Sequence, residues 1–289
     1  MKTAVIDPGG GMKGAFSAGV TDAFLDAGID FDLYLGVSAG AANLASFAAH
    51  QRGRTYAFYL EYAMRSQYMS VSNFLKKGSY FDFDYIFTTL TNRGGEYPID
   101  YPELMRNPGD VISVTTNALS GRPVYWHKDC LKQDQYEVFK ATCSIPWLCS
   151  PRILENLPMV DGTISDPLPV KKALELGAEL IVVVMPNSTE RLQKGAADQM
   201  VIDLLKHSRK TAWMPGLEKA MSSRTDHYNE GLDLLEQLEK ESRAIIVIPD
   251  DGHHVKALSR NKENLEALYE EGMKQGRKAA KQILEKLAE

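Results

Sequence analysis

Ser38 lies at the centre of the pentapeptide Gly36-Val37-Ser38-Ala39-Gly40, between an apolar strand-like run and an alanine-rich stretch that predicts a helix. Small neighbours such as Gly36 and Gly40 let a chain turn sharply from strand to helix and expose the serine hydroxyl, as in a nucleophile elbow. Small residues at such a turn also arise from packing alone. The pattern by itself therefore leaves both a catalytic and a structural role for Ser38 open.

A second glycine-rich turn follows the strand-like segment Thr3 to Ile6 and precedes a helical pattern. It consists of Gly9, Gly10, Gly11, Met12, Lys13 and Gly14. Backbone amide groups exposed at a helix start suit an oxyanion or a phosphate. The spacing also matches G-x-G-x-x-G, but a dinucleotide site expects an acidic residue near the end of the next strand, where this chain has Ser38. We predict an oxyanion hole, with a non-catalytic phosphate or nucleotide site as the alternative.

These two turns are expected to lie side by side, because the ends of successive parallel strands meet at one edge of a sheet. A serine that acts as a nucleophile also needs a base. Asp161, in an Asp-Gly turn after a short apolar segment, is the candidate. The alternative is a triad in the order Ser38, Asp161 and a later histidine such as His253. That arrangement normally has several strands before its elbow, whereas a single strand precedes Ser38 here.

In their order along the chain, these motifs resemble those of the patatin-like phospholipase family. The matching features are the glycine loop with Lys13 before its last glycine, the elbow Gly36 to Gly40, the small-residue segment Ala141 to Pro146, and Asp161-Gly162. The resemblance covers about residues 3 to 185. It implies a Ser-Asp dyad in which Ser38 attacks an ester carbonyl and Asp161 takes its proton, so that no histidine is required.

Two positions depart from the family pattern. Pro8 precedes the glycines and has no amide hydrogen, so we assign the oxyanion donors to Gly10 and Gly11, with Met12 as a further candidate. Thr163 stands where a glycine or alanine commonly follows, which affects the turn after Asp161. An ordinary aspartate pKa of about 3.9 suits a general base poorly near neutrality. We therefore predict that Asp161 is partly desolvated and titrates above that value.

The elements that must position these residues form an α/β pattern, in which short apolar runs alternate with helical periodicity. The family resemblance implies three layers, with a largely parallel sheet flanked by helices. Strands are predicted at Thr3 to Ile6, Leu33 to Val37, Val111 to Thr116, Val124 to His127, Leu180 to Met185 and Ala244 to Ile248. Helices are predicted at Gly14 to Ala27, Ala41 to His50 and Asn261 to Glu289.

We divide the chain into a catalytic core at residues 1–189 and a mostly helical C-terminal region at residues 190–289, with one further strand near residues 244–248. Aromatic residues crowd positions 56–87, where they line an acyl pocket, form a lid or simply pack in the core. Residues 98–108, bounded by two prolines, predict a loop. The basic residues of the last helix either touch a membrane surface or form a solvated face, which the interspersed acids favour.

Composition narrows the choice of partners. A net charge of −5 argues against a nucleic-acid partner. The longest aliphatic run, Leu180 to Met185, is far shorter than the roughly 20 residues of a membrane helix, so any lipid contact is expected to be peripheral. Three cysteines and no signal-peptide pattern favour the cytoplasm. We predict a lipid acyl hydrolase or esterase acting on phospholipids or related lipids, without cofactor or metal. Besides the phosphate or nucleotide site, a further alternative to catalysis is a protein-interaction or regulatory role.

Overall fold

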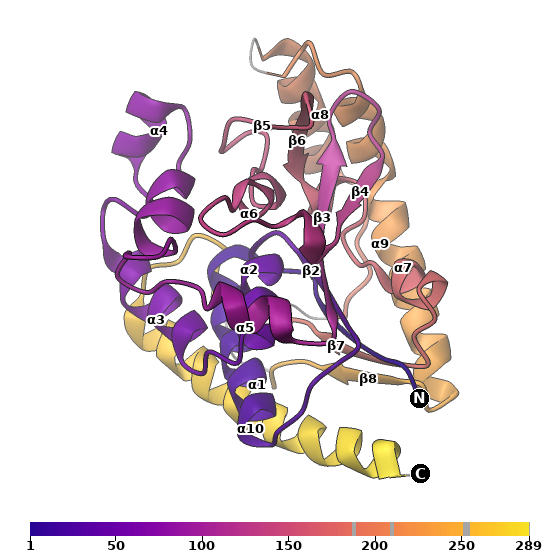
Figure 1. Ribbon diagram of the computed structural model, residues 1–289. Helices are drawn as coiled ribbons and strands as arrows, with labels where there is room; N and C mark the ends of the chain where they lie inside the picture. Colours follow the sequence, from indigo (N-terminus) through magenta and orange to yellow (C-terminus); the bar gives the residue numbers. More distant parts are fainter. Residues whose placement is uncertain (187–188, 209–210, 251–254, 289) are drawn as a thin grey trace.

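The computed structural model describes residues 1–186, 189–208, 211–250 and 255–288. A central sheet lies between two layers of helices (Figure 1), which confirms the predicted three-layer α/β fold. The strands are β1 (Thr3–Asp7), β2 (Leu33–Val37), β3 (Asp110–Asn117), β4 (Pro123–Trp126), β5 (Arg152–Leu154), β6 (Leu157–Asp161), β7 (Leu180–Val184) and β8 (Ala244–Val247).

Hydrogen-bonded neighbours in the sheet follow the order β5-β6-β3-β2-β1-β7-β8, and β4 also pairs with β3. The pairs from β3 through β2, β1 and β7 to β8 are parallel, whereas β4, β5 and β6 pair in antiparallel fashion. The strands β1 and β7 are buried along their whole length, as expected for a sheet that is covered on both faces.

Successive side chains of β1 point to opposite faces, and each face packs against its own helices. Val5 joins the apolar cluster formed with α1 (Ala15–Asp26), α2 (Ala39–Ala48) and α10 (Lys262–Ala288). Ala4 and Ile6 join the cluster formed with α7 (Val170–Glu175) and α9 (Gly216–Lys240). The shorter helices are α3 (Arg54–Leu60), α4 (Val71–Lys77), α5 (Tyr101–Arg106), α6 (Glu137–Thr142) and α8 (Ala196–His207).

The register of β3 brings the ends of β2 and β6 together. Thr115 and Thr116 pair with β4 and also with β6, so β4 and β6 lie on opposite edges of β3. Ser113 and Val114 pair with β4 on one edge of β3 and with β2 on the other edge. Strands β2 and β6 therefore share the edge that faces away from β4, and their C-terminal ends meet there. Val37 is opposite Val114, and Asp161 is opposite the next residue, Thr115. The residue after β2 is therefore adjacent to the last residue of β6.

Two segments contain regular structure that was not predicted. The short apolar segment before Gly162 is β6, which forms a hairpin with β5 and includes Pro158. Residues 98–108 contain α5, because the Asp100 side chain accepts a hydrogen bond from the Glu103 amide and caps the helix. Pro102 lies in the first turn of that helix, where its missing N–H group is not needed. The prediction that residues 98–108 form only a loop was therefore wrong.

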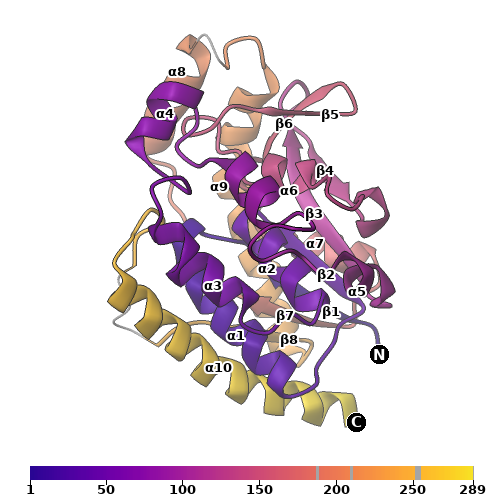
Figure 2. The same cartoon turned by 60° about the vertical axis from the view of Figure 1, so that its left-hand side comes forward.

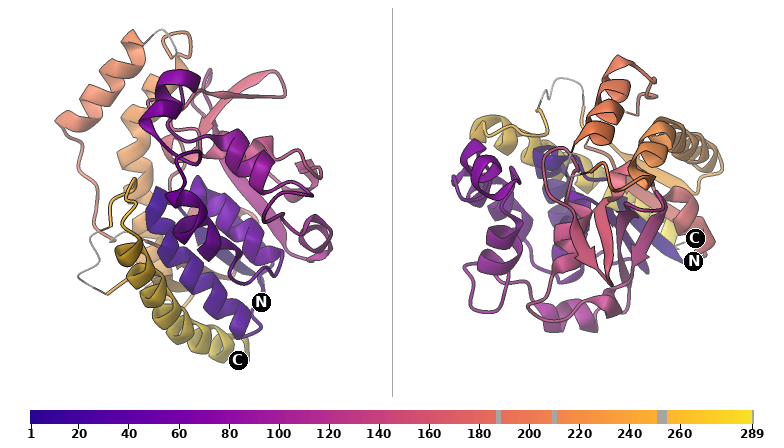
Figure 3. Two further views of the ribbon diagram at one scale, coloured as in Figure 1. Left: turned by 90° about the vertical axis from the view of Figure 1, so that its left-hand side faces the viewer. Right: turned by 90° about the horizontal axis from the view of Figure 1, so that it is seen from above.

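The C-terminal region is built onto the predicted core. Strand β8 extends the sheet beside β7, and α10 lies along α1 (Figure 2). A Cβ atom on Gly19 would lie 2.1 Å from the carbonyl oxygen of Tyr269, so the two helices approach as closely as glycine allows. The predicted boundary near residue 190 stays a prediction. The chain start and the end of α10 lie at one end of the molecule, and α4 and α8 lie at the other (Figure 3).

Candidate active site

Ser38 occupies a sharp turn between β2 and α2, with a φ of 55°, which is uncommon for a residue other than glycine. Its backbone amide donates a hydrogen bond of 2.9 Å to Thr142 Oγ1, which stabilises this conformation. A Cβ atom on Gly36 would lie 2.3 Å from Ala41 Cα, and one on Gly40 would lie 2.1 Å from the Asp7 carbonyl oxygen. Both flanking glycines are therefore needed for the close packing of the turn.

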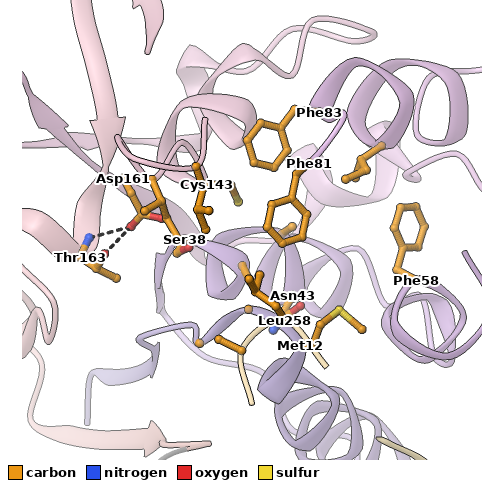
Figure 4. A pocket seen from close by; sticks show the side chains of 18 of the residues that line it. Met12, Ser38, Asn43, Phe58, Phe81, Phe83, Cys143, Asp161, Thr163 and Leu258 are labelled. Carbon is orange, nitrogen blue, oxygen red and sulfur yellow. Dashed lines mark hydrogen bonds between the residues drawn. The ribbon is translucent and has the colours of Figure 1, made fainter. Parts of the chain in front are cut away.

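The Ser38 hydroxyl donates a hydrogen bond of 2.7 Å to Asp161 Oδ2. The other carboxylate oxygen, Oδ1, accepts hydrogen bonds from the Thr163 amide at 2.9 Å and from the Thr163 hydroxyl at 2.7 Å (Figure 4). Gly162 lies against β3, where a Cβ atom would be 2.3 Å from the Val114 carbonyl oxygen. The turn thus fixes the Asp161 side chain, and Thr163 adds a hydroxyl contact to it.

Burial is the main influence on the ionisation of Asp161. The side chain is fully buried, and desolvation raises its pKa to about 6 in spite of the hydrogen bonds from Ser38 and Thr163 that favour the carboxylate. This is the direction predicted from the sequence. A carboxyl group with such a pKa is largely ionised at neutral pH and remains basic enough to accept a proton from a hydroxyl group.

The glycine loop lies directly beside the Ser38 turn, as predicted. A Cβ atom on Gly9 would be 2.5 Å from the Val37 carbonyl oxygen. The Gly9 amide donates a hydrogen bond of 2.9 Å to Asp7 Oδ1, and the Met12 amide donates one of 2.9 Å to the Ala257 carbonyl oxygen. Both amides therefore already have an acceptor within the protein.

The other loop residues differ in whether their amide groups face the cavity. The Lys13 amide donates to the Gly10 carbonyl oxygen, and Gly14, which is packed against the Tyr59 hydroxyl, does not line the cavity. Within the described part of the chain, no hydrogen-bond acceptor is found for the amides of Gly10 and Gly11, and both residues line a cavity that also contains Ser38. Of the six residues predicted for this loop, these two have amide groups open to a ligand.

The cavity has a volume of about 500 Å³ and a predominantly apolar wall. Ser38 and Asp161 lie at its surface together with residues from α2, α3, the segment after α6, and the C-terminal region. In Figure 4, Asp161 and Thr163 lie on one side of Ser38, whereas Phe58, Phe81 and Phe83 lie on the other. The cavity therefore extends from the hydroxyl group of Ser38 into an aromatic compartment.

The aromatic residues between positions 56 and 87 have two different environments. Those that line the cavity are Phe58, Tyr59, Tyr68, Phe81, Phe83 and Phe87. Others pack elsewhere: Tyr56 contacts the Tyr269 ring at 4.7 Å, and Phe74 on α4 is 40% exposed. The segment thus contributes both to the pocket and to ordinary packing.

Histidines in the described part of the chain make contacts outside the cavity. His50 pairs with Asp30 and Glu103, His127 with Asp110, and the ring of His227 contacts the Ser165 carbonyl oxygen. His207 contacts the carbonyl oxygen of a residue in its own helix. His253, the example given for a triad, lies outside the described residues, as does His254. No group of three potential metal ligands is found among the described residues.

Several polar residues of the site carried no recognisable signal in the sequence. Asp7 is fully buried, where desolvation raises its pKa to about 6, and it accepts hydrogen bonds from the Gly9 amide and from Asn43 Nδ2. It thereby fixes the glycine loop. Thr142 lies within the small-residue segment noted above, but nothing there indicated its bond to Ser38. Arg224 comes from α9, far along the chain, and lines the same cavity.

Arg54 is a second cation on the cavity wall and, unlike Arg224, it is buried. Its guanidinium group donates to Ser46 Oγ, Thr91 Oγ1 and the Tyr97 carbonyl oxygen, and it lies 4.3 Å from the Phe58 ring centroid. Burial lowers its pKa to about 10, so it remains charged at neutral pH. The residue joins α2, α3 and the segment before α5 behind the aromatic compartment.

Comparisons with known proteins agree with this architecture. The family model described as Patatin-like phospholipase matches residues 8–174, and a model described as a domain of unknown function, DUF6363, matches residues 214–288. The chain is 28% identical over 220 residues to the uncharacterized protein YjjU of Escherichia coli K12, which covers 71% of this chain and 61% of the relative. The chain therefore spans about three fifths of that relative's length.

A crystal structure of VipD from Legionella pneumophila is also similar. The likeness has a TM-score of 0.49 and a sequence identity of 14%, and it covers 97% of this chain and 67% of that chain.

Proposed function

Because this chain belongs to the patatin-like phospholipase family, we propose that it is a lipid acyl hydrolase in which Ser38 and Asp161 form the catalytic dyad. The observation that carries the proposal is the hydrogen bond of 2.7 Å between Ser38 Oγ and Asp161 Oδ2 at the surface of an apolar cavity. A nucleophile and a base in direct contact, beside amide donors open to the cavity, form the arrangement that acyl transfer requires.

In the first half of the reaction, an ester enters with its acyl chain in the aromatic compartment. Ser38 Oγ attacks the carbonyl carbon, and its proton passes to Asp161 Oδ2. The amides of Gly10 and Gly11 stabilise the negative charge that develops on the carbonyl oxygen. When the tetrahedral intermediate collapses, the alcohol leaves with the proton from Asp161, and the acyl group remains on Ser38.

In the second half, water attacks the acyl group on Ser38. Asp161 accepts a proton from this water, and the same two amides stabilise the second tetrahedral intermediate. The carboxylic acid is released when the bond to Ser38 Oγ breaks and the proton returns to that oxygen. The two hydrogen bonds from Thr163 keep the carboxylate oriented in both halves.

The rival interpretations have less support. A triad needs a histidine within reach of Ser38 Oγ, but among the described residues that hydroxyl contacts Asp161 and no histidine lines the cavity. A phosphate or nucleotide site does not require the hydrogen bond between the Ser38 hydroxyl and the Asp161 carboxylate. Phospholipids or related acyl esters as substrates, a cytoplasmic location and peripheral lipid contact stay predictions. No helix in the described ranges has the length and apolar character needed to span a bilayer.

The pH dependence of hydrolysis tests this proposal directly. Because Asp161 must be ionised to accept the proton and its pKa is about 6, we expect kcat/KM for an acyl ester to rise with pH and level off above about 7. At pH 5 it should be about a tenth of the plateau, as expected for one proton lost near pH 6. Rates of p-nitrophenyl octanoate hydrolysis between pH 4 and 9 provide the measurement.

Asp7 also has a pKa of about 6, so an Asp7→Asn variant is the necessary control. The ascending limb should persist in this variant, because Asp7 holds the loop and takes no proton from Ser38. If the limb vanishes with Asp7→Asn, Asp161 is not the titrating base. If none of several acyl esters is hydrolysed, the proposed function is wrong.

A Gly11→Ala variant tests the position of the oxyanion donors. At this residue φ is 60°, and the new Cβ atom would lie 2.4 Å from the Ala257 carbonyl oxygen, so the loop must shift. We expect kcat to fall by about ten- to a hundred-fold, because a displaced donor stabilises the oxyanion less well. Steady-state kinetics with the same octanoyl ester give the value.

Gly28→Ala is the matched control. Gly28 has a similar φ of 66°, but no atom lies within 4 Å of the place that a new Cβ atom would take, so the backbone strain is comparable without a collision. Gly28→Ala should lose a few degrees of thermal stability and keep its activity, whereas Gly11→Ala should lose more stability, because its collision adds to the same backbone strain. Equal activity losses in the two variants would mean that the loop does not act through its geometry beside Ser38.

A further inference from the structure

The C-terminal region contributes a cation to the active site. Arg224 lies on α9, one turn after Met221, and both residues line the cavity. The same helix packs against the Asp161 turn, since Leu217 and Met221 share an apolar cluster with Ile164. The helix therefore holds Arg224 beside the base of the dyad.

One hydrogen bond fixes the direction of this side chain. Arg224 Nε donates to the Thr163 carbonyl oxygen at 3.0 Å, and Thr163 is the residue that holds the Asp161 carboxylate. In the ranges that the structure describes, the two terminal nitrogens of the guanidinium group donate to no carboxylate, although the charge of Arg224 acts to lower the pKa of Asp161. These nitrogens remain available to a ligand in the cavity.

Among the described residues, Arg93, Arg122, Arg260 and Arg277 also form no ion pair, but the arginines that line the cavity are Arg54 and Arg224. Arg52, Arg65 and Arg191 each form an ion pair with an aspartate or glutamate. Arg54 also lacks a carboxylate partner among the described residues, but it makes three hydrogen bonds and is covered by Phe58. A guanidinium group presents paired N–H donors that match the oxygens of a phosphate group.

The location of Arg224 indicates which part of a substrate it meets. Thr163, its hydrogen-bond partner, lies on the opposite side of Ser38 from Phe81 and Phe83 (Figure 4). An ester whose acyl chain occupies the aromatic compartment directs its alcohol portion toward the Thr163 side. The group nearest to Arg224 is then a substituent of the leaving alcohol.

From these contacts we propose that Arg224 binds a phosphate group on the alcohol portion of the substrate, so that the site prefers acyl esters of phosphorylated alcohols to acyl esters of neutral alcohols. The inference rests on the proposed function and specifies its substrate class. It also gives a role to the C-terminal region, residues 214–288 of which match a domain of unknown function: this region completes the substrate site.

Binding to a Ser38→Ala protein tests this preference without turnover. Calorimetric titrations compare octanoyl glycerol phosphate with octanoyl glycerol, which share one acyl chain and differ in the phosphate. We expect the phosphorylated ligand to bind about ten-fold more tightly, and this difference to disappear when Arg224→Gln is added, because a charged hydrogen-bond donor to phosphate is lost. Arg224→Lys should retain part of the difference, since it keeps the charge.

Two controls separate this effect from others. Arg191→Gln removes the same charge from an exposed part of the C-terminal region and should leave the preference unchanged. Inorganic phosphate alone tests for a site that binds the free ion: we expect it to displace octanoyl glycerol phosphate only weakly. If inorganic phosphate binds as tightly as the phosphorylated ester, the site takes a free anion, and the proposal is overturned.

Kinetic measurements with protein that retains Ser38 complete the test. Arg224→Gln should raise KM for octanoyl glycerol phosphate by about ten-fold and change that for octanoyl glycerol little. Equal losses for both esters would indicate a purely structural role through Thr163 and overturn the proposal. If octanoyl glycerol is hydrolysed without any phosphate preference, this inference fails and the hydrolase function stands. If phosphate-dependent binding is found without turnover, the hydrolase function fails instead.

Discussion

Replacing Ser38 with alanine is expected to lower kcat/KM for acyl esters by at least about 10³-fold, because the residual rate then depends on the oxyanion donors and binding alone. The same variant should not react with a fluorophosphonate probe, which forms a bond to an activated serine oxygen. The wild-type protein should be labelled once, on the peptide that contains Ser38. Hydrolysis of p-nitrophenyl octanoate and mass spectrometry of labelled peptides provide the two measurements.

Ser144→Ala is the matched control for this experiment. Ser144 is buried like Ser38, but its hydroxyl donates to the Lys140 carbonyl oxygen of the preceding turn and does not line the cavity. This variant should be labelled and should hydrolyse esters at close to the wild-type rate. Equal labelling of Ser38→Ala and wild type would exclude Ser38 as the nucleophile.

The parts of the site that are local in sequence were predictable. Both glycine-rich turns follow strands whose apolar runs are short and continuous, and the bounds of β2 were predicted correctly as Leu33 to Val37. Tight turns between a strand and a helix restrict residue type strongly, so Gly36 and Gly40 remain visible in a single sequence. The family resemblance then indicated Asp161 as the partner of Ser38.

The parts that depend on distant contacts were not predictable. Strand β6 has five residues and one proline, and its place at the end of β2 follows from the register of β3. The contact between Thr142 and the Ser38 amide joins residues more than one hundred positions apart. Arg224 depends on the packing of α9 against the Asp161 turn, which no local pattern encodes.

The carboxyl group of Asp161 illustrates a conflict between function and stability. Its burial gives the pKa that a base near neutral pH requires, yet a buried carboxylate without a cationic partner in direct contact is unfavourable. Removing the charge should therefore separate the two properties. Asn is the appropriate substitute, since it has almost the same shape and its oxygen still accepts the two hydrogen bonds from Thr163.

An Asp161→Asn variant should lose hydrolysis by about 10³- to 10⁴-fold, because an amide cannot take the proton of Ser38. Fluorophosphonate labelling should slow correspondingly, whereas binding of octanoyl ligands should change little. The kinetics are measured at pH 8, where the wild-type carboxylate is ionised. Retention of more than about a tenth of the wild-type rate would indicate a different base, and single replacements of the histidines would then identify it.

The same variant should be more stable than wild type at pH 8. The pKa of Asp161 is raised from 3.8 to about 6 in the folded protein, so its stabilising contribution is present below about pH 4 and is lost as the pH rises through 6. The difference corresponds to about 3 kcal/mol in favour of the asparagine variant above pH 7. Thermal melting should therefore show nearly equal midpoints at pH 4, and at pH 8 a midpoint for Asp161→Asn that is higher by about 5 °C. A midpoint difference that does not grow between these pH values would mean that the Asp161 carboxyl titrates normally, and its role as a base near neutral pH would lose its physical basis.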